Sequence, residues 1–375
     1  MPTRHGWMLA VAGIATLVIA RVFGIIELYV IATGMLGVVV LAVVIVQLRR
    51  PQFAILRWAH PSTLTVGETG RVDLLIQNRR RSRSPAVDIT EPVGTASTAR
   101  MSVVPLRARA QVTASYRVPT SQRGVIALGP TMIERSDLLG LASTTSVVTG
   151  TTDVIVAPQA YELPMPALGA GVLGRHLLAL SQRIGPGEFH SLRDYVSGDE
   201  PRNIHWRASA RSDDLKVRQH EAQGVRRCIV ILDRDRVSYP DSDAFERAIV
   251  AAASVVTSAE RSGLTTRFVT PGLDLRGPEV ANHTLHALAP IEIGGPLGEI
   301  ERDPAEGLGL VVVVTGSPRS SGWAATDRVS DPTLTRIGVF TAEGGDARRA
   351  VDAGTLARFR QSWGELTGVR ESVRR

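Results

Sequence analysis

The sequence predicts a chain in three parts: an N-terminal transmembrane α-hairpin, a β-sandwich-like middle region and a C-terminal doubly wound α/β domain. Three observations support this fold class. Residues 6–48 are apolar and almost uncharged, residues 53–156 contain short runs of alternating polarity, and beyond residue 225 apolar runs alternate with helical stretches. A chain of 375 residues is also long enough for more than one domain.

The apolar first segment is long enough for two membrane-spanning helices. Residues 6–48 carry only two formally charged side chains, Arg21 and Glu27. One spanning helix needs about 20 apolar residues, so we expect helices over about 6–22 and 28–48. A single long span or a cleaved signal peptide is the alternative. The sequence has no small-residue cleavage site followed by a polar segment, which argues against a signal peptide.

The net charge of +7 is concentrated next to this segment. Residues 47–83 hold eight arginines and two acidic residues, whereas residues 228–375 hold 17 basic and 20 acidic residues. Arginines flanking a span stay on the cytoplasmic side, so we expect a multi-pass plasma-membrane protein whose soluble domains face the cytoplasm. The cluster suits anionic lipid, or else forms an exposed loop tip at 79–83. Nucleic acid is therefore not an expected partner.

The middle region has the pattern of a small antiparallel sandwich. Runs with a period of two are separated by Gly, Pro and Ser, and they contain many β-branched residues. We expect strands over Gly70–Gln77, Ala110–Val118, Val125–Leu128 and Asp153–Val156. The region has no cluster of acidic, His or Cys residues, so it is interpreted as a spacer or an interaction module.

Residues 158–186 are rich in Pro and Gly and are predicted to be a linker. Gly169, Gly171 and Gly174 have the G-x-G-x-x-G spacing of dinucleotide-binding loops. That motif binds pyrophosphate only where a strand feeds the loop and a helix follows, and here two prolines precede the glycines instead. We therefore expect no dinucleotide cofactor.

The densest polar motif lies at residues 187–221, which read GEFHSLRDYVSGDEPRNIHWRASARSDDLKVRQHE. Apolar and aromatic residues are interleaved with the charges, which indicates a folded segment. Asp199 can pair with the neighbouring arginines, so the segment is either an ion-paired latch or a surface for a ligand or partner. Catalysis would need a nucleophile and a base, and Ser191 with His190 or His205 is the candidate set.

The C-terminal part has the pattern of a parallel sheet covered by helices. Nearly continuous apolar strands are expected at Cys228–Leu232, Thr266–Val269, Leu310–Val314 and Ile337–Phe340, with helices at Ala244–Glu260 and Ala347–Trp363. Ligands of such sheets bind at the carboxyl ends of the strands, which points to residues 233–237 and 315–317. The single cysteine lies in the first of these strands and excludes an internal disulfide.

The order G-x-F-x-S-L-R-x-Y-x-x-G-D-x-x-R-x-I-x-W-x-A-S-A-R in the polar segment resembles the signature of the DUF58 family. The matching residues are Gly187, Phe189, Ser191, Leu192, Arg193, Tyr195, Gly198, Asp199, Arg202, Ile204, Trp206, Ala208, Ser209, Ala210 and Arg211. The resemblance extends to the membrane hairpin, to a D-P-F-G-L-like turn at Asp137–Leu141 that lacks the Pro and Phe, and to a von Willebrand A-like C-terminal half.

The resemblance implies an uncharacterised bacterial membrane protein that is often encoded beside a MoxR-type AAA+ ATPase, with no established enzymatic activity. The signature then becomes the expected partner-binding surface. Its residues are Arg193, Tyr195, Gly198, Asp199, Arg202, His205, Trp206, Ser209 and Arg211.

The von Willebrand A resemblance also raises the question of a divalent cation. Such domains hold the ion with D-x-S-x-S after the first strand and with a Thr and an Asp from other loops. Here Asp233 is followed by Asp235 and Val237 in the two serine positions, and Thr315 follows a later strand. Asp233, Asp235 and Thr315 are the candidate ligands for magnesium. A degenerate, metal-free domain is the expectation, because Val237 cannot bind a metal ion and the sequence Thr315-Gly316-Ser317 lacks the Asp that is usual in related domains.

The function expected from these observations is that of a non-enzymatic, membrane-anchored scaffold working with a MoxR-type AAA+ ATPase in the assembly or maturation of envelope complexes. The alternative is a divalent-metal-dependent binder of acidic peptides or proteins. The expected boundaries are a hairpin at 1–50, a β-rich domain at 51–157, a linker at 158–186, the signature at 187–221, the α/β domain at 222–365 and a tail at 366–375.

Overall fold

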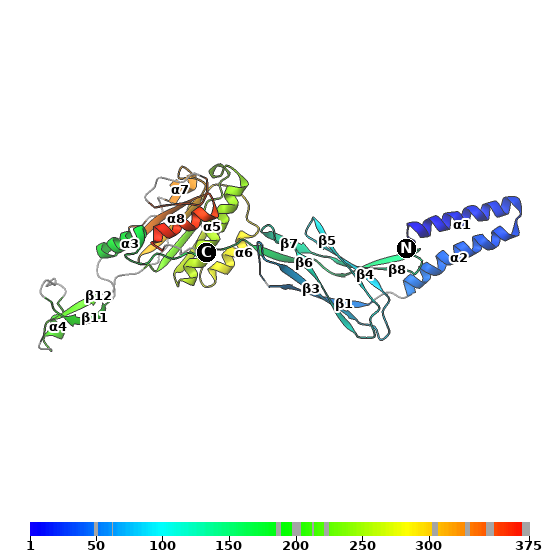
Figure 1. Ribbon diagram of the computed structural model, residues 1–375, viewed down its shortest axis with the longest axis horizontal. Coiled ribbons are helices and arrows are strands. Elements are labelled where there is room, and N and C mark those ends of the chain that lie inside the picture. Colours follow the sequence, from blue (N-terminus) through cyan, green and yellow to red (C-terminus); the bar gives the residue numbers. More distant parts are fainter. Residues whose placement is uncertain are drawn as a thin grey trace. The chain divides into compact units, whose positions relative to one another are not determined.

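The computed structural model describes residues 1–48, 52–61, 63–184, 189–196, 204–211, 214–220, 225–301, 307–326, 331–342 and 349–369. The chain forms two compact units, Met1–Ala157 and Pro158–Arg375. Figure 1 shows the helical hairpin and the strand-rich part of the first unit, and the α/β part of the second.

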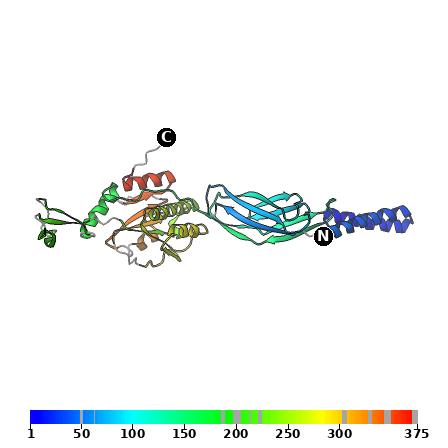
Figure 2. The ribbon, with the colours of Figure 1, turned by 90° about the horizontal axis from the view of Figure 1, so that it is seen from below.

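The first unit begins with two long apolar helices, α1 (Arg4–Phe23) and α2 (Ile26–Leu48). Both are long and apolar enough to cross a membrane, by length and composition. They lie side by side in Figure 1 and overlap in the view of Figure 2. Gly24 ends α1 with a φ of 66°, and its N–H bonds to the Ala20 carbonyl, so the chain reverses within two residues.

The rest of the first unit is built of strands in two sheets, in which every pair is antiparallel except β2 with β10. One sheet has the order β1-β3-β6, and the other has the order β2-β10-β7-β4-β8-β9 with β5 paired to β4. The strands are β1 (Phe53–His60), β2 (Leu64–Thr65), β3 (Gly70–Asn78), β4 (Val87–Val93), β5 (Ser97–Val103), β6 (Gln111–Val118), β7 (Gly124–Leu128), β8 (Thr131–Ser136), β9 (Ser143–Thr149) and β10 (Thr152–Ala157).

Alternation along the strands builds the core between these sheets. In β3, Val72, Leu74 and Ile76 are fully buried, while the residues between them are more exposed. They pack in one cluster with Ile89 and Ile133 of the other sheet. The predicted sheet-rich middle region is confirmed, because a period of two places every second side chain on the same face.

The second unit contains a six-stranded sheet of order β15-β14-β13-β16-β17-β18, parallel except for β15. Its elements are β13 (Arg227–Leu232), α5 (Ser242–Arg261), β14 (Thr265–Thr270), β15 (Leu273–Arg276), α6 (Val280–Leu288), β16 (Gly309–Thr315), α7 (Ser321–Ala325), β17 (Leu334–Phe340), β18 (Ala350–Asp352) and α8 (Leu356–Thr367). All residues of β13 and β16 are buried. The predicted C-terminal α/β region is thereby confirmed.

Two expectations at the edges of this unit are wrong. Residues 158–186, expected to be a linker, contain α3 (Gly171–Ile184), whose Leu173 and Leu177 are fully buried in the core. The helix expected at 347–363 is interrupted, because the chain forms β18 first and α8 then starts after the N-cap Thr355.

The glycines that resembled a nucleotide loop allow close packing of two helix ends. Gly171 starts α3 with a φ of 59°, and a Cβ there would lie 2.4 Å from the backbone nitrogen of Gly368. Gly368 follows the last residue of α8, Thr367, which is buried. The expected tail therefore starts later than residue 366.

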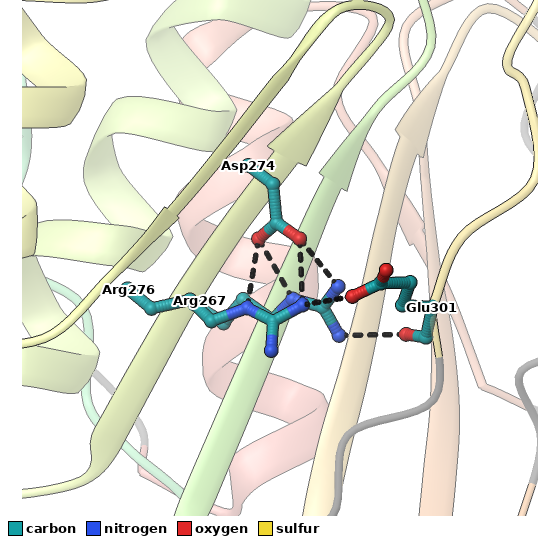
Figure 3. A network of polar contacts seen from close by, with 4 residues as sticks. All are labelled: Arg267, Asp274, Arg276 and Glu301. Carbon is teal, nitrogen blue, oxygen red and sulfur yellow. Dashed lines mark hydrogen bonds and ion pairs between the residues drawn. The ribbon is translucent and has the colours of Figure 1, made fainter.

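An ion-pair network links β14 and β15 at the antiparallel edge of this sheet (Figure 3). Arg267 and Arg276 stand opposite each other on β14 and β15, a pairing of like charges that would be destabilising alone. Both guanidinium groups donate to Asp274, at 2.7–2.9 Å from Arg267 and 2.7–3.1 Å from Arg276. Hydrogen bonds from Arg267, then from Arg276, hold the pKa of Asp274 well below its usual range.

Replacing this carboxylate tests the network. We expect Asp274→Asn to lower the free energy of unfolding of this unit by about 1–2 kcal/mol, since Arg267 is 5% exposed and would lose a charged partner. Because the pKa of Asp274 is depressed in the folded state, the difference in free energy of unfolding between variant and parent is largest above the unfolded-state pKa near 3.9. It becomes smaller as the pH falls below that value.

Urea unfolding between pH 3 and pH 7 measures both effects. Asp243→Asn is the matched control, because Asp243 is exposed in the first turn of α5 and its loss should cost only tenths of a kcal/mol. Equal effects of the two variants, or a difference that widens in acid, would contradict the assignment.

Candidate functional site

The candidate site lies where two neighbouring parallel strands end. Asp233 directly follows β13, and Thr315 is the last residue of the adjacent β16. The Asp233 side chain is fully buried. Its Oδ1 accepts the N–H of Asp235 at 2.9 Å, and its Oδ2 accepts the hydroxyls of Ser238 at 2.6 Å and Thr315 at 2.9 Å. Both carboxylate oxygens are therefore satisfied by protein donors.

Thr315 is itself hydrogen-bonded to Ser320, the N-cap of α7. Because a hydroxyl has one proton, Thr315 gives it to Asp233, and its oxygen accepts from Ser320 Oγ at 2.9 Å. Ser320 also caps α7 by accepting the N–H of Trp323 at 3.1 Å. The start of α7 approaches so closely that a Cβ on Gly322 would lie 2.4 Å from Asp233 Oδ2. Glycine is therefore required at this position.

The loop after β13 is held from several sides. The hydroxyl of Tyr239 donates to the Asp233 carbonyl at 2.6 Å, and burial, followed by the charge of Asp233, raises the pKa of Tyr239 well above its ordinary value. Asp235 accepts the N–H of Val237 at 3.1 Å and the hydroxyl of Ser321 at 2.9 Å. Val237 itself is 91% exposed. The result is a fixed loop with an apolar side chain at its tip.

The structure brings together two of the three predicted metal ligands. Asp233 and Thr315 are in direct contact, whereas the Asp235 carboxylate turns to Ser321. Sequence reasoning missed Ser238, because the D-x-S-x-S spacing places the two serine positions at Asp235 and Val237. A 3-10 turn at Arg236–Ser238 instead exposes Val237 and points the next residue at Asp233.

These side chains fit a hard divalent cation in donor type, because all of them offer oxygen. Among the described residues, however, no group of three or more His, Cys, Asp or Glu could hold a metal ion. A cation at this edge would rely on two carboxylates and on hydroxyls that already serve Asp233.

A second candidate site is the signature arm, which we define as β11 (Phe189–Asp194), α4 (Trp206–Ser209) and β12 (Lys216–His220), labelled in Figure 1. The two strands pair antiparallel, and Lys216 forms an ion pair with Asp194. The His205 N–H donates to the Lys216 carbonyl at 2.7 Å, and the Lys216 N–H donates to Ser209 Oγ at 2.8 Å. These bonds hold α4 on β12.

Several predicted signature residues maintain this arm. His205 Nδ1 accepts the N–H of Ala208 at 3.0 Å and so caps α4, and Ser209 Oγ also donates to the His205 carbonyl at 3.2 Å. The aromatic residues behave differently. Trp206 is 64% exposed, and Tyr195 and its neighbour Val196 are exposed as well.

The remaining signature residues divide into two groups. Arg211 is exposed beside α4. Gly198, Asp199 and Arg202 lie outside the described residues, as does the side chain of Arg193.

Together, these features define a class of protein: an apolar helical hairpin followed by a two-sheet β domain, with an α/β unit whose sheet ends in a carboxylate–hydroxyl network. Residues 191–276 match the family described as "Protein of unknown function DUF58". The match runs from β11 to the end of β15 and supports the resemblance read from the signature. No curated protein matches the chain.

Solved structures show only low similarity. The CARDB domain of a Pyrococcus furiosus protein, in complex with di-metal ions, is 12% identical over 30% of this chain and 97% of that one, with a TM-score of 0.24. A PKD domain of an M14-like peptidase from Thermoplasmatales archaeon SCGC AB-540-F20 is 14% identical over 29% and 100%, with a TM-score of 0.20. A β-glucosidase from Listeria innocua is 12% identical over 30% and 16%, with a TM-score of 0.20.

The contact between Thr315 and Asp233 gives a testable prediction. Thr315→Val keeps the shape of the side chain and removes a hydroxyl donor from a buried carboxylate, so we expect a loss of about 1–3 kcal/mol in the free energy of unfolding of this unit. Urea unfolding of the full chain in detergent, with hydrogen exchange of peptides from β13 and β16, measures the loss.

Thr265→Val is the control, because Thr265 is an exposed β-branched residue on β14. Its effect should stay within about 0.5 kcal/mol, as for most surface substitutions. The same protection of β13 and β16 in both variants would contradict the role given to Thr315.

Proposed function

We propose that the chain is a non-enzymatic, membrane-anchored interaction protein that presents binding surfaces to other proteins. The observation that carries the proposal is that polar groups stabilise the signature arm from within while an aromatic side chain stays exposed on it. The polar groups of His205, Ser209 and Lys216 bond within the arm, while Trp206 remains exposed. A surface ordered in this way is suited to recognition, since exposed tryptophans are frequent hot spots of interfaces.

The non-enzymatic part of the proposal is supported by how the reactive groups are used. Asp233 is buried and accepts bonds on both oxygens, and His205 accepts a backbone N–H as a helix cap. Burial raises the pKa of the Cys228 thiol to about 12, so the nucleophilic thiolate is scarce. Each of these groups has a structural task that competes with a chemical one.

The anchoring part rests on α1 and α2, which have the length and composition of membrane spans. The arginines that follow α2 favour a cytoplasmic location for the soluble parts in a plasma-membrane protein with two spans. The lipid bilayer is then one obligatory partner of the chain.

The protein partner is proposed from the DUF58 resemblance together with the chemistry of the arm. The resemblance implies a MoxR-type AAA+ ATPase and a role in the assembly or maturation of envelope protein complexes. On α4, exposed Trp206 stands beside exposed Arg207, with Arg211 just beyond the helix. Exposed aromatic and guanidinium groups in one segment suit a partner surface with an apolar pocket and an acidic rim.

Capture of the partner tests this proposal. Full-length protein solubilised in detergent should retain an AAA+ ATPase from a native membrane extract in the presence of ATP. Trp206→Ala should weaken retention at least about 30-fold, the equivalent of a 2 kcal/mol hot spot. Quantitative mass spectrometry of the eluate measures retention.

Trp58→Ala is the matched control, because Trp58 is 45% exposed on β1 of the other unit. It should leave retention unchanged. Recovery of no AAA+ ATPase by the parent protein would count against the partner, and equal retention by both variants would remove the arm from the interface.

The alternative is a divalent-metal-dependent binder of acidic peptides, and one observation favours it. Oxygen donors of Asp233, Ser238 and Thr315 meet at the carboxyl edge of the sheet, with Asp235 and Ser321 beside them. A magnesium ion held there could accept a carboxylate from a partner. Against this, both oxygens of Asp233 already accept hydrogen bonds from protein donors.

Magnesium titration distinguishes the two functions. For the metal-free scaffold we expect no saturable heat when Mg²⁺ is titrated into the full-length protein in detergent. A one-to-one heat that disappears in Asp235→Asn would favour the metal-dependent binder. Asp243→Asn is the control, since Asp243 is an exposed carboxylate of the same unit that lies on α5.

A further inference from the structure

The turn between β8 and β9 is fastened to the ends of the two apolar helices. The Thr3 N–H donates to the Leu141 carbonyl at 2.8 Å, and the N-terminal amine donates to the Ser143 carbonyl at 2.6 Å. Leu141 and Ala142 share an apolar cluster with Val46 of α2. The cluster joins α2 to the base of this turn.

Close backbone contact fixes the depth of the turn along the helices. A Cβ on Gly6 would lie 2.0 Å from the Leu141 carbonyl oxygen, so only glycine fits. The buried Arg135, on β8, donates to the carbonyls of Ile45 and Val46 on α2, both at 3.3 Å. The turn therefore stands level with the start of α1 and the last turns of α2.

The tip of this turn carries two strongly exposed leucines. Leu138 is 106% exposed and Leu139 is 67% exposed. Asp137 shapes the tip by accepting the N–H groups of Leu139 at 2.9 Å and Ala142 at 2.6 Å. Two neighbouring leucines held out by a fixed turn form an apolar wedge.

The wedge borders a groove of about 590 Å³ that runs along α2. Its helical wall is formed by Val38, Leu41, Ala42 and Ile45, and the opposite wall includes Pro85, Pro105, Leu138 and Leu139. Val38 is ten residues from the end of α2 at Leu48, so the groove extends about 15 Å into the apolar segment at the α-helical rise.

We propose that Leu138 and Leu139 insert into the bilayer and that the groove holds a phospholipid acyl chain. This inference rests on the proposed membrane insertion of α1 and α2. The occupant is lipid because the helical wall of the groove belongs to the spanning segment itself. Trp7, 60% exposed near the start of α1, stands where aromatic residues mark the membrane–water boundary.

Spin labels on single introduced cysteines test the insertion. The native Cys228 is fully buried and stays in place, since burial raises its thiol pKa to about 12. Labels are attached at Leu139→Cys, at Leu41→Cys in the span and at Val147→Cys, an exposed site on β9. Full-length protein is reconstituted into phosphatidylethanolamine–phosphatidylglycerol vesicles, and collisions with oxygen and with a water-soluble nickel chelate are compared.

We expect the labels at 41 and 139 to lose nickel collisions and gain oxygen collisions, and the label at 147 to show the reverse. Leu138→Cys repeats the test on the second leucine without disturbing the core, because its side chain is fully exposed. If the label at 41 reports lipid while the labels at both 138 and 139 report water, the insertion of the turn is wrong and the membrane anchor stands. If the label at 41 reports water, the membrane anchor itself is wrong. If the label at 147 reports lipid, the turn has no specific role in membrane insertion.

Discussion

The second unit depends on satisfying one buried carboxylate. Asp233 directly follows the central strand β13 and is fully buried, and a carboxyl group is costly to bury unless hydrogen bonds satisfy it. The donors come from its own loop, through Asp235 and Ser238, and from β16, through Thr315. Because the loop after β13 and the end of β16 both donate to this side chain, a displacement of either one removes a hydrogen bond from a buried carboxyl group.

The first unit has a comparable constraint at the base of its hairpin. The last carbonyls of α2 lack intrahelical partners, and Arg135 supplies both hydrogen bonds and positive charge to two of them. The start of α1 is closed by the Thr3 cap and by backbone bonds to Leu141 and Ser143. A helix pair that enters lipid must satisfy its backbone in this way, since the bilayer offers no water.

Periodicity in the sequence predicted several elements, although it also left out strands such as β4, whose burial alternates, and elements that depend on tertiary contacts. Strands such as β3 and β13 follow from alternation and from an apolar run. Helix α3 was missed because Pro and Gly around it suggested a linker, although Leu173 and Leu177 complete the core. Ser238 was missed because a single 3-10 turn moves the hydroxyl by one residue, which spacing alone cannot reveal.

These two constraints bear on what the molecule can do. Polar groups that could perform chemistry, such as Asp233 and His205, are bonded to the backbone and to hydroxyls that hold the fold. Several exposed side chains are apolar instead, and Trp206, Val237 and Leu138 each lie at the tip or on the face of an ordered element. Fixed apolar side chains lower the entropic cost of association, because the free state is already ordered. This lower entropic cost supports the proposed role of the chain in the recognition of proteins and lipid.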